Sequence, residues 1–198
     1  MDQQLLETLN AFLVQHHDVR VPVVDFVVSA QVAIAILVIG LFVLGRRATR
    51  RGAFLAGCSA ATGVLAAQGI TALVDRARPF VADPVIQVMV HHGPDRSFPS
   101  DSATGAFAIA VALYAYAPRW GRAILVLAGL LAVGRVAVGM HYPTDVLTGA
   151  VLGALTAIVL RAAPIRTRLE RLADELSRVA SLGWAGDRRR PVRPAGTA

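Results

Sequence analysis

Long apolar stretches alternate along the chain with short breaks of polar and charged residues. A transmembrane helix needs about 20 mostly apolar residues, and five stretches approach that length. These stretches cover residues 22–44, 53–74, 100–117, 123–140 and 143–160. The third and fourth are less uniform, because Asp101 and Ser102 open the third and Arg135 lies deep in the fourth. The pattern predicts an all-α protein, a polytopic membrane helix bundle of about five transmembrane helices.

The segment before the first stretch has a helical pattern of its own. Between residues 2 and 16, one helical face carries five apolar side chains, namely Leu5, Leu6, Leu9, Phe12 and Leu13. Such a face is typical of an N-terminal amphipathic helix that lies at the membrane surface. It equally suits a helix that packs against the bundle, and the sequence leaves both arrangements open.

The segment after the last stretch is polar and basic. Its apolar residues recur at helical spacing as Ile165, Leu169, Leu172 and Leu176, and residues 187–193 are rich in arginine and proline. We therefore predict a membrane domain over residues 1–161 and a cytoplasmic basic tail over 162–198, a short helix followed by a disordered end. An anionic leaflet would attract this tail, and we expect no nucleic-acid partner.

All 20 basic residues are arginines, and they are unevenly divided between the two sides of the predicted bundle. Fifteen fall on the side of the C-terminus and five on the other. Because positive charge marks the cytoplasmic side, we expect a multi-pass plasma-membrane protein with its N-terminus outside and its C-terminus inside. The absence of lysine excludes Schiff-base chemistry, and a single cysteine, Cys58, excludes disulfides and cysteine-cluster metal sites.

Polar and ionisable residues in and beside the spans fall on one side of the membrane when the spans alternate in direction. They are Arg76, Arg78, Ser100, Asp101, Ser102, Arg135, His141 and Asp145. Ionisable residues within membrane spans are costly and usually functional. Random placement would divide them between the two sides, so their convergence predicts one site that faces outward.

The residue types indicate a site for an anion. Arg78 and Arg135 offer planar forks of N–H donors that fit phosphate or carboxylate oxygens. The helix that starts after Ser100 has free backbone N–H groups, which bind anions with the help of the helix dipole. The alternative is that Ser100 or Asp101 only caps this helix.

His141 precedes Asp145 by four residues, and Pro143 between them suits the first turn of a helix. In that geometry the carboxylate can accept one imidazole N–H and leave the other nitrogen free as a base or nucleophile. The alternative is a capping aspartate beside a surface histidine. Two arginines and a helix start at the same depth favour the functional interpretation.

Three motifs in this order resemble those of the type 2 phosphatidic acid phosphatase family, which includes membrane lipid phosphatases and is related in fold to vanadium haloperoxidases. The family pattern is lysine, six residues and Arg-Pro; then Pro-Ser-Gly-His; then Ser-Arg, five residues, histidine, three residues and aspartate. The matching positions here are Arg78-Pro79, Pro99-Ser100-Asp101-Ser102, and Gly134-Arg135 with His141 and Asp145. The resemblance covers about residues 53–160.

The resemblance implies that His141 attacks phosphorus and forms a phosphohistidine, while Asp145 holds the imidazole ring. The residues that would bind the phosphoryl group are Arg78, Arg135 and Ser100, with Asp101 and Arg76 as further candidates. It implies no metal and no other cofactor. Asp101, where many members have glycine, resembles the bacterial undecaprenyl-diphosphate phosphatase branch.

The chain departs from the family pattern at three positions. Thr71 replaces the lysine, whose charge Arg76 would supply from one turn nearer the loop. Ser102 replaces the second histidine, which is the acid that protonates the leaving group. The substitute acids that the sequence offers are His91, His92 and Asp101. Gly134 replaces a serine, which is the mildest of the three changes.

The missing acid bears on the substrate. Losing a positioned general acid costs about 10²- to 10⁴-fold in rate, but a phosphate leaving from a diphosphate, with a second pKa of about 6, needs a proton less than an alkoxide does. We therefore expect hydrolysis of a polyprenyl diphosphate, by preference undecaprenyl diphosphate to undecaprenyl phosphate, at the outer face.

Two alternatives remain open at this stage. One is a phosphatase for lipid monophosphates such as phosphatidic acid or phosphatidylglycerol phosphate. The other is a non-catalytic member that binds a phosphorylated lipid. In each case the partners are a phosphorylated membrane lipid and the bilayer, and the oligomeric state is not determined.

Overall fold

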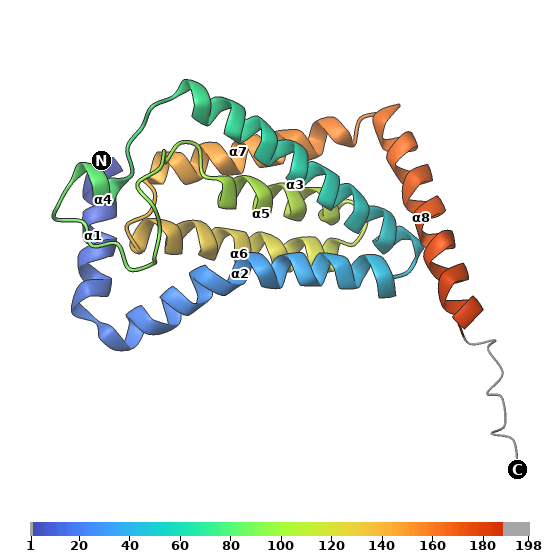
Figure 1. Cartoon of the computed structure of the whole chain (residues 1–198), viewed down its shortest axis with the longest axis horizontal. Coiled ribbons are helices and arrows are strands. Elements are labelled where there is room, and N and C mark those ends of the chain that lie inside the picture. The colour runs from blue at the N-terminus through green and yellow to red at the C-terminus, as the bar shows by residue number, and fades with distance from the viewer. Residues whose placement is uncertain (1, 188–198) are drawn as a thin grey trace, which may run out of the picture.

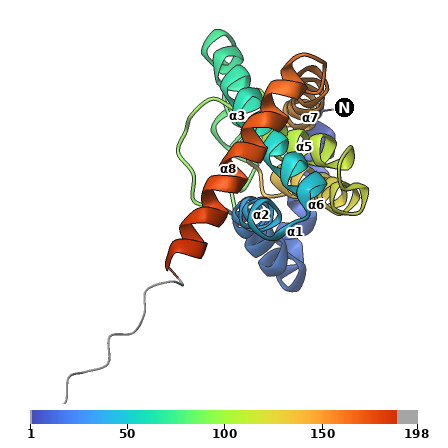
Figure 2. The same ribbon diagram turned by 90° about the vertical axis from the view of Figure 1, so that its right-hand side faces the viewer.

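The computed structural model describes residues 2–187, which form helices joined by loops. Five helices run side by side along the long axis of the molecule (Figure 1). They are α2 (His17–Leu44), α3 (Arg47–Leu73), α5 (Asp101–Tyr114), α6 (Pro118–Ala137) and α7 (Pro143–Leu160). Helix α1 (Asp2–Gln15) crosses one end of this bundle and α8 (Ile165–Asp187) crosses the other, while the short α4 (Pro79–Ala82) lies in the loops beside α1 (Figures 1 and 2). The predicted all-α membrane bundle is confirmed.

Four of these helices, α2, α3, α6 and α7, are long and apolar enough to cross a bilayer. The fifth, α5, has 14 residues and extends over about 21 Å at about 1.5 Å per residue, less than the hydrocarbon thickness of about 30 Å. Helix α5 is thus shorter than the span expected over residues 100–117. Helix α5 packs against α3, α6 and α7, so protein encloses it, and Figure 1 shows its start set back from the end of the bundle that α1 crosses.

The predicted fourth span also ends too late. Helix α6 stops at Ala137, three residues before Met140. Gly139 follows with a φ of 80°, a left-handed conformation that glycine adopts without the steric cost of a Cβ atom. This turn releases the chain from α6 and leads it directly to His141, one of the predicted site residues.

Two glycines let α7 approach α5 closely. A Cβ atom added at Gly149 would lie 2.5 Å from the carbonyl oxygen of Ser100, and one at Gly153 would clash with the carbonyl oxygen of Thr104. The two glycines are four residues apart and so share one helix face, the small-residue spacing that brings membrane helices together. This packing fixes the start of α5 against the start of α7.

We expect Gly153→Val to destabilise the bundle by about 3 kcal/mol, because the added side chain must push the backbones of α5 and α7 apart. The matched control is Gly129→Val on α6, where an added Cβ meets nothing within 4 Å. Thermal unfolding of both variants in detergent measures the difference. Equal melting temperatures for the two variants would show that the α5–α7 contact contributes little to stability.

The two crossing helices are held by different contacts. Helix α1 buries Leu6 and Leu13 in the bundle and leaves Leu5 and Phe12 about half exposed, so the structure shows the packing arrangement that the sequence left open. Helix α8, with 23 residues, is longer than the short helix predicted for the tail. Ion pairs such as that from Arg51 of α3 to Asp174 of α8 join the two helices. The predicted disordered end, residues 188–198, lies outside the described residues.

Candidate active site

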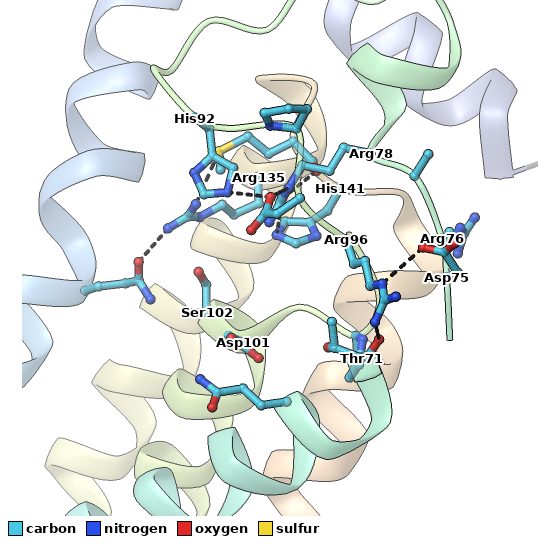
Figure 3. A pocket seen from close by; sticks show the side chains of 17 residues that line it. Thr71, Asp75, Arg76, Arg78, His92, Arg96, Asp101, Ser102, Arg135 and His141 are labelled. Atoms are coloured by element: carbon cyan, nitrogen blue, oxygen red, sulfur yellow. Dashed lines mark hydrogen bonds and ion pairs between the residues drawn. The ribbon is translucent and has the colours of Figure 1, made fainter. Parts of the chain in front are cut away.

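A cavity of about 860 Å³ opens at the end of the bundle that α1 crosses. Its walls come from α2, α3, α5, α6 and the loops that follow α3, α4 and α6. The sequence-predicted residues that line it are Thr71, Arg76, Arg78, His92, Asp101, Ser102, Arg135 and His141 (Figure 3). The structure thus gathers into one place residues that lie up to 70 positions apart in the chain.

The His141 ring is buried and its hydrogen-bond partners define its tautomer. Nδ1 lies 2.9 Å from the carbonyl oxygen of Ser97, which can only accept, so Nδ1 carries the proton. Nε2 lies 3.3 Å from Nη1 of Arg78, which can only donate, so Nε2 carries the lone pair. The predicted hydrogen bond from His141 to Asp145 is not formed, because the carboxylate oxygen lies 3.7 Å from Nδ1, at ion-pair distance.

The protonation state of His141 also suits a nucleophile. Burial is the largest influence and lowers the pKa of His141 below its ordinary range, and the charge of Arg78 lowers it further, against the opposing effect of Asp145. A lowered pKa means that the ring is neutral at neutral pH. Its Nε2 lone pair is therefore available at the wall of the cavity.

Asp145 is fully buried at the start of α7, and its two oxygens have separate partners. Oδ2 accepts the backbone N–H of Tyr142 at 2.9 Å, and Oδ1 accepts from Nη1 of Arg76 at 2.7 Å. Arg76 also donates to Asp2 of α1 and to Thr144. Arg76 thus lines the cavity while it pairs with the carboxylates of Asp145 and Asp2. Its role as a substitute for the family lysine stays a prediction.

Arg78 is the arginine closest to the imidazole. It is buried, and its Nη1 donates to the carbonyl oxygen of Met140 at 3.0 Å besides facing His141. Its Nε donates to Asp95, an exposed carboxylate on the loop before α5. A phosphate that replaces Asp95 at this guanidinium would lie next to the Nε2 lone pair.

Arg135 approaches the cavity from α6. Its Nη2 donates to the side-chain oxygen of Gln31 on α2, its Nη1 lies 3.2 Å from the sulfur of Met140, and its buried Nε has no hydrogen-bond partner. Within residues 2–187, no carboxylate pairs with Arg135. Buried donors without acceptors are costly, and an anion bound in the cavity would satisfy this one.

The first turn of α5 forms the floor of the cavity. Ser100 is fully buried, and its side-chain oxygen accepts the backbone N–H of Ala103 at 3.5 Å, so the structure shows the capping role that the sequence allowed. Asp101 and Ser102 follow and line the cavity. Thr71 of α3, at the family lysine position, donates to the carbonyl oxygen of Phe98 and thereby ties α3 to this loop. Phosphate binding by Ser100 stays a prediction.

Three contacts at the site come from residues that the sequence analysis did not single out. They are the Ser97 carbonyl on His141, the Asp95 carboxylate on Arg78 and the Gln31 amide on Arg135. Gln31 had a signal, because an amide within a long apolar span marks a functional or packing role. The contact from Ser97 had no such signal, because it is made by the backbone carbonyl, which every residue type has.

The chain belongs to the PAP2 superfamily, whose pattern matches residues 51–168. It is 30% identical over 156 residues to undecaprenyl-diphosphatase BcrC of Bacillus subtilis, a match that covers 78% of this chain and 80% of that protein. It is 35% identical over 127 residues to decaprenylphosphoryl-5-phosphoribose phosphatase of Mycobacterium tuberculosis, covering 62% of this chain and 66% of that one.

A solved structure supports the same fold. Aquifex aeolicus LpxE superposes with a TM-score of 0.65 at 23% identity, over 80% of this chain and 93% of the other. The family match and the similarity to BcrC identify the chain as a lipid phosphatase of this superfamily, and its long apolar helices are those of a multi-pass membrane protein. The resemblance that its three motifs indicated is confirmed.

Proposed function

We propose that this protein hydrolyses a polyprenyl diphosphate, undecaprenyl diphosphate by preference, to the monophosphate through a phosphohistidine on His141. The observation that carries the proposal is the unprotonated Nε2 of His141, which accepts from Nη1 of Arg78 at 3.3 Å in the wall of an 860 Å³ cavity. The relative BcrC, similar over most of both chains, is named for this substrate. The serine at position 102, where the family has its acid, favours a leaving group that needs little protonation.

The reaction proceeds in two displacements. In the first, Nε2 of His141 forms a bond to the terminal phosphorus while the bond from phosphorus to the bridging oxygen breaks, and the electron pair leaves with the lipid monophosphate. The resulting imidazolium keeps its Nδ1 proton on the Ser97 carbonyl, 2.9 Å away, and the nearby Asp145 carboxylate stabilises its charge. In the second, water attacks phosphorus, the N–P bond breaks, and inorganic phosphate leaves.

Arg78 and Arg135 stabilise the charge on the transferred group. The phosphoryl oxygens displace Asp95 from Arg78 and meet the unpartnered Nε of Arg135. Donors that already point at the developing charge need no rearrangement during the reaction. Asp145 lies on the Nδ1 side of the His141 ring and stabilises the positive charge that the ring gains. Arg76 and the backbone N–H of Tyr142 hold the Asp145 carboxylate in place.

We place the cavity on the outer face of the plasma membrane. The opposite end of the bundle carries the arginines at the start of α3, namely Arg46, Arg47, Arg50 and Arg51, and those of α8. Positive charge favours the cytoplasmic side. Labelling of a cysteine introduced at Asp95 by an impermeant thiol reagent on intact cells tests this orientation, and labelling only after lysis would contradict it.

We expect kcat/KM to be at least about tenfold higher for undecaprenyl diphosphate than for undecaprenyl phosphate, because an alkoxide leaving group depends on a well-placed acid more than a phosphate does, and the family's acid is a serine at position 102. The two substrates share one tail, so the comparison isolates the headgroup. Phosphate release by the purified protein in detergent, with a chelator present, measures the ratio.

Two other results would favour a different function for this protein. Faster release from monophosphates, phosphatidic acid or phosphatidylglycerol phosphate included, would favour the second candidate. The similarity to decaprenylphosphoryl-5-phosphoribose phosphatase, whose name contains a 5-phosphate monoester on ribose and no diphosphate, is the observation behind that candidate. Tight binding of lipid without any release after long incubation would indicate a non-catalytic role.

A further inference from the structure

No step above assigns the proton donor for the leaving group, although Asp101, one of the candidates from the sequence, lines the cavity. Ser102 lines the cavity at the position where the family has a histidine, but an alcohol is far too weak an acid to replace an imidazolium. The loop between α4 and α5 adds one titratable side chain to the cavity wall that no step above uses. This side chain is His92.

His92 is linked to the reacting centre through two side chains. Its Nε2 lies 3.2 Å from the same oxygen of Asp95 that accepts from Nε of Arg78. Arg78 in turn faces Nε2 of His141 at 3.3 Å. One carboxylate and one guanidinium therefore separate the two imidazoles. Figure 3 shows the His92 ring at the cavity beside Arg135, across from the first turn of α5.

The charges that face His92 make its protonation sensitive to substrate. Burial is the largest influence on His92 and lowers its pKa. The positive charges of Arg78 and Arg135 lower this pKa further, and the negative charge of Asp95 raises it. A diphosphate bound to the two arginines would cancel their positive charge and add negative charge of its own, which favours the imidazolium. Bound substrate therefore raises the pKa of His92 relative to the ligand-free site.

Ser102, at the position of the family histidine, and His92, in the loop before α5, differ in their exposure to solvent. Ser102 is buried, whereas His92 is exposed, so the His92 ring is in contact with the solvent from which it can exchange a proton. The neighbouring His91 does not line the cavity. His91 is therefore a matched control for any experiment on His92.

Building on the function proposed above, we propose that His92 is the catalytic acid and base of this enzyme, with Asp95 as its positioning residue. In the first displacement the His92 imidazolium gives its proton to the bridging oxygen as the P–O bond breaks, and the lipid monophosphate leaves. In the second, neutral His92 takes a proton from the water that attacks phosphorus. The N–P bond then breaks, phosphate leaves, and both histidines return to their starting states.

The test compares a leaving group that needs a proton with one that does not. The full-length protein in detergent is assayed with undecaprenyl diphosphate and with p-nitrophenyl phosphate, whose nitrophenolate leaves unprotonated. We expect His92→Gln to lower kcat for the diphosphate by about 10²-fold and for the nitrophenyl ester by less than about threefold. His91→Gln should leave both unchanged.

Two further variants separate catalysis from structure. Adding Ser102→His to His92→Gln places an imidazole at the family position and should restore at least about tenfold of the lost diphosphate rate. Asp95→Asn removes the negative charge that raises the pKa of His92, so the fall of kcat at high pH should move to lower pH. Melting temperatures show whether each variant is folded.

The outcomes distinguish this proposal from the function on which it rests. If His141→Ala retains turnover, the proposed function fails regardless of His92. If His141→Ala is inactive but His92→Gln affects both substrates equally, or neither, His92 is not the acid. A leaving-group-dependent loss in Asp101→Asn alone would assign the proton to that carboxylate and overturn the proposal.

Discussion

His141→Ala is expected to lower phosphate release by at least about 10⁵-fold, the scale on which enzymes lose rate when a covalent nucleophile is removed. Alanine leaves no lone pair next to Arg78, and the surrounding cavity offers no second nucleophile in that position. The residual rate would come from binding and from the arginines alone, with water attacking phosphorus directly.

The measurement is single-turnover phosphate release from undecaprenyl diphosphate at saturating enzyme. His91→Ala, at an exposed position of the loop between α4 and α5, is the matched control and should retain its full rate. His141 is buried, so the melting temperature of the variant must be compared with that of the parent. A folded His141→Ala protein with more than about a hundredth of the parent rate would be incompatible with nucleophilic catalysis by this residue.

Arg78→Ala is expected to lower kcat by about 10³-fold, because it removes a buried charge that faces both the nucleophile and the transferred group. Arg78→Lys keeps the charge but not the fork that donates to His141, to the Met140 carbonyl and to Asp95. We therefore expect the lysine variant to recover only part of the lost rate.

The control for Arg78 is Arg96→Ala. Arg96 also lines the cavity, but its donors go to Asp75 and to carbonyl oxygens at the end of α3. Steady-state kinetics of both variants should show a fall in kcat for Arg78 and a change of less than about threefold for Arg96. Equal losses at the two positions would mean that the cavity acts through overall charge and not through a specific contact.

The fold could largely be predicted from the sequence, because lipid imposes a simple rule on length and apolarity. Helices α2, α3, α6 and α7 satisfy that rule directly. Helix α5 departs from it, since neighbouring helices surround it and its length is set by packing. The site could be predicted in outline for a related reason: spans of alternating direction bring Arg78, Arg135 and His141 to the same end.

The contacts within the site could not be predicted in the same way. Spacing alone paired His141 with Asp145, but the chain before α5 brings a backbone carbonyl, that of Ser97, closer to Nδ1. An isolated bridge between Ala77 and Arg96 aligns the two loops and holds Ser97 near Arg76. Long-range loop pairing of this kind leaves no periodic signal, so the partners of the imidazole became visible only in three dimensions.

The most direct test of the account is to trap the phosphoenzyme. The protein is mixed with undecaprenyl diphosphate labelled with ³²P in its terminal phosphate, quenched in alkali within one turnover, and digested for mass spectrometry. We expect an acid-labile, alkali-stable phosphoryl group on the imidazole of His141 and its absence from His141→Ala. Turnover without any label on protein, or label on another residue, would contradict it.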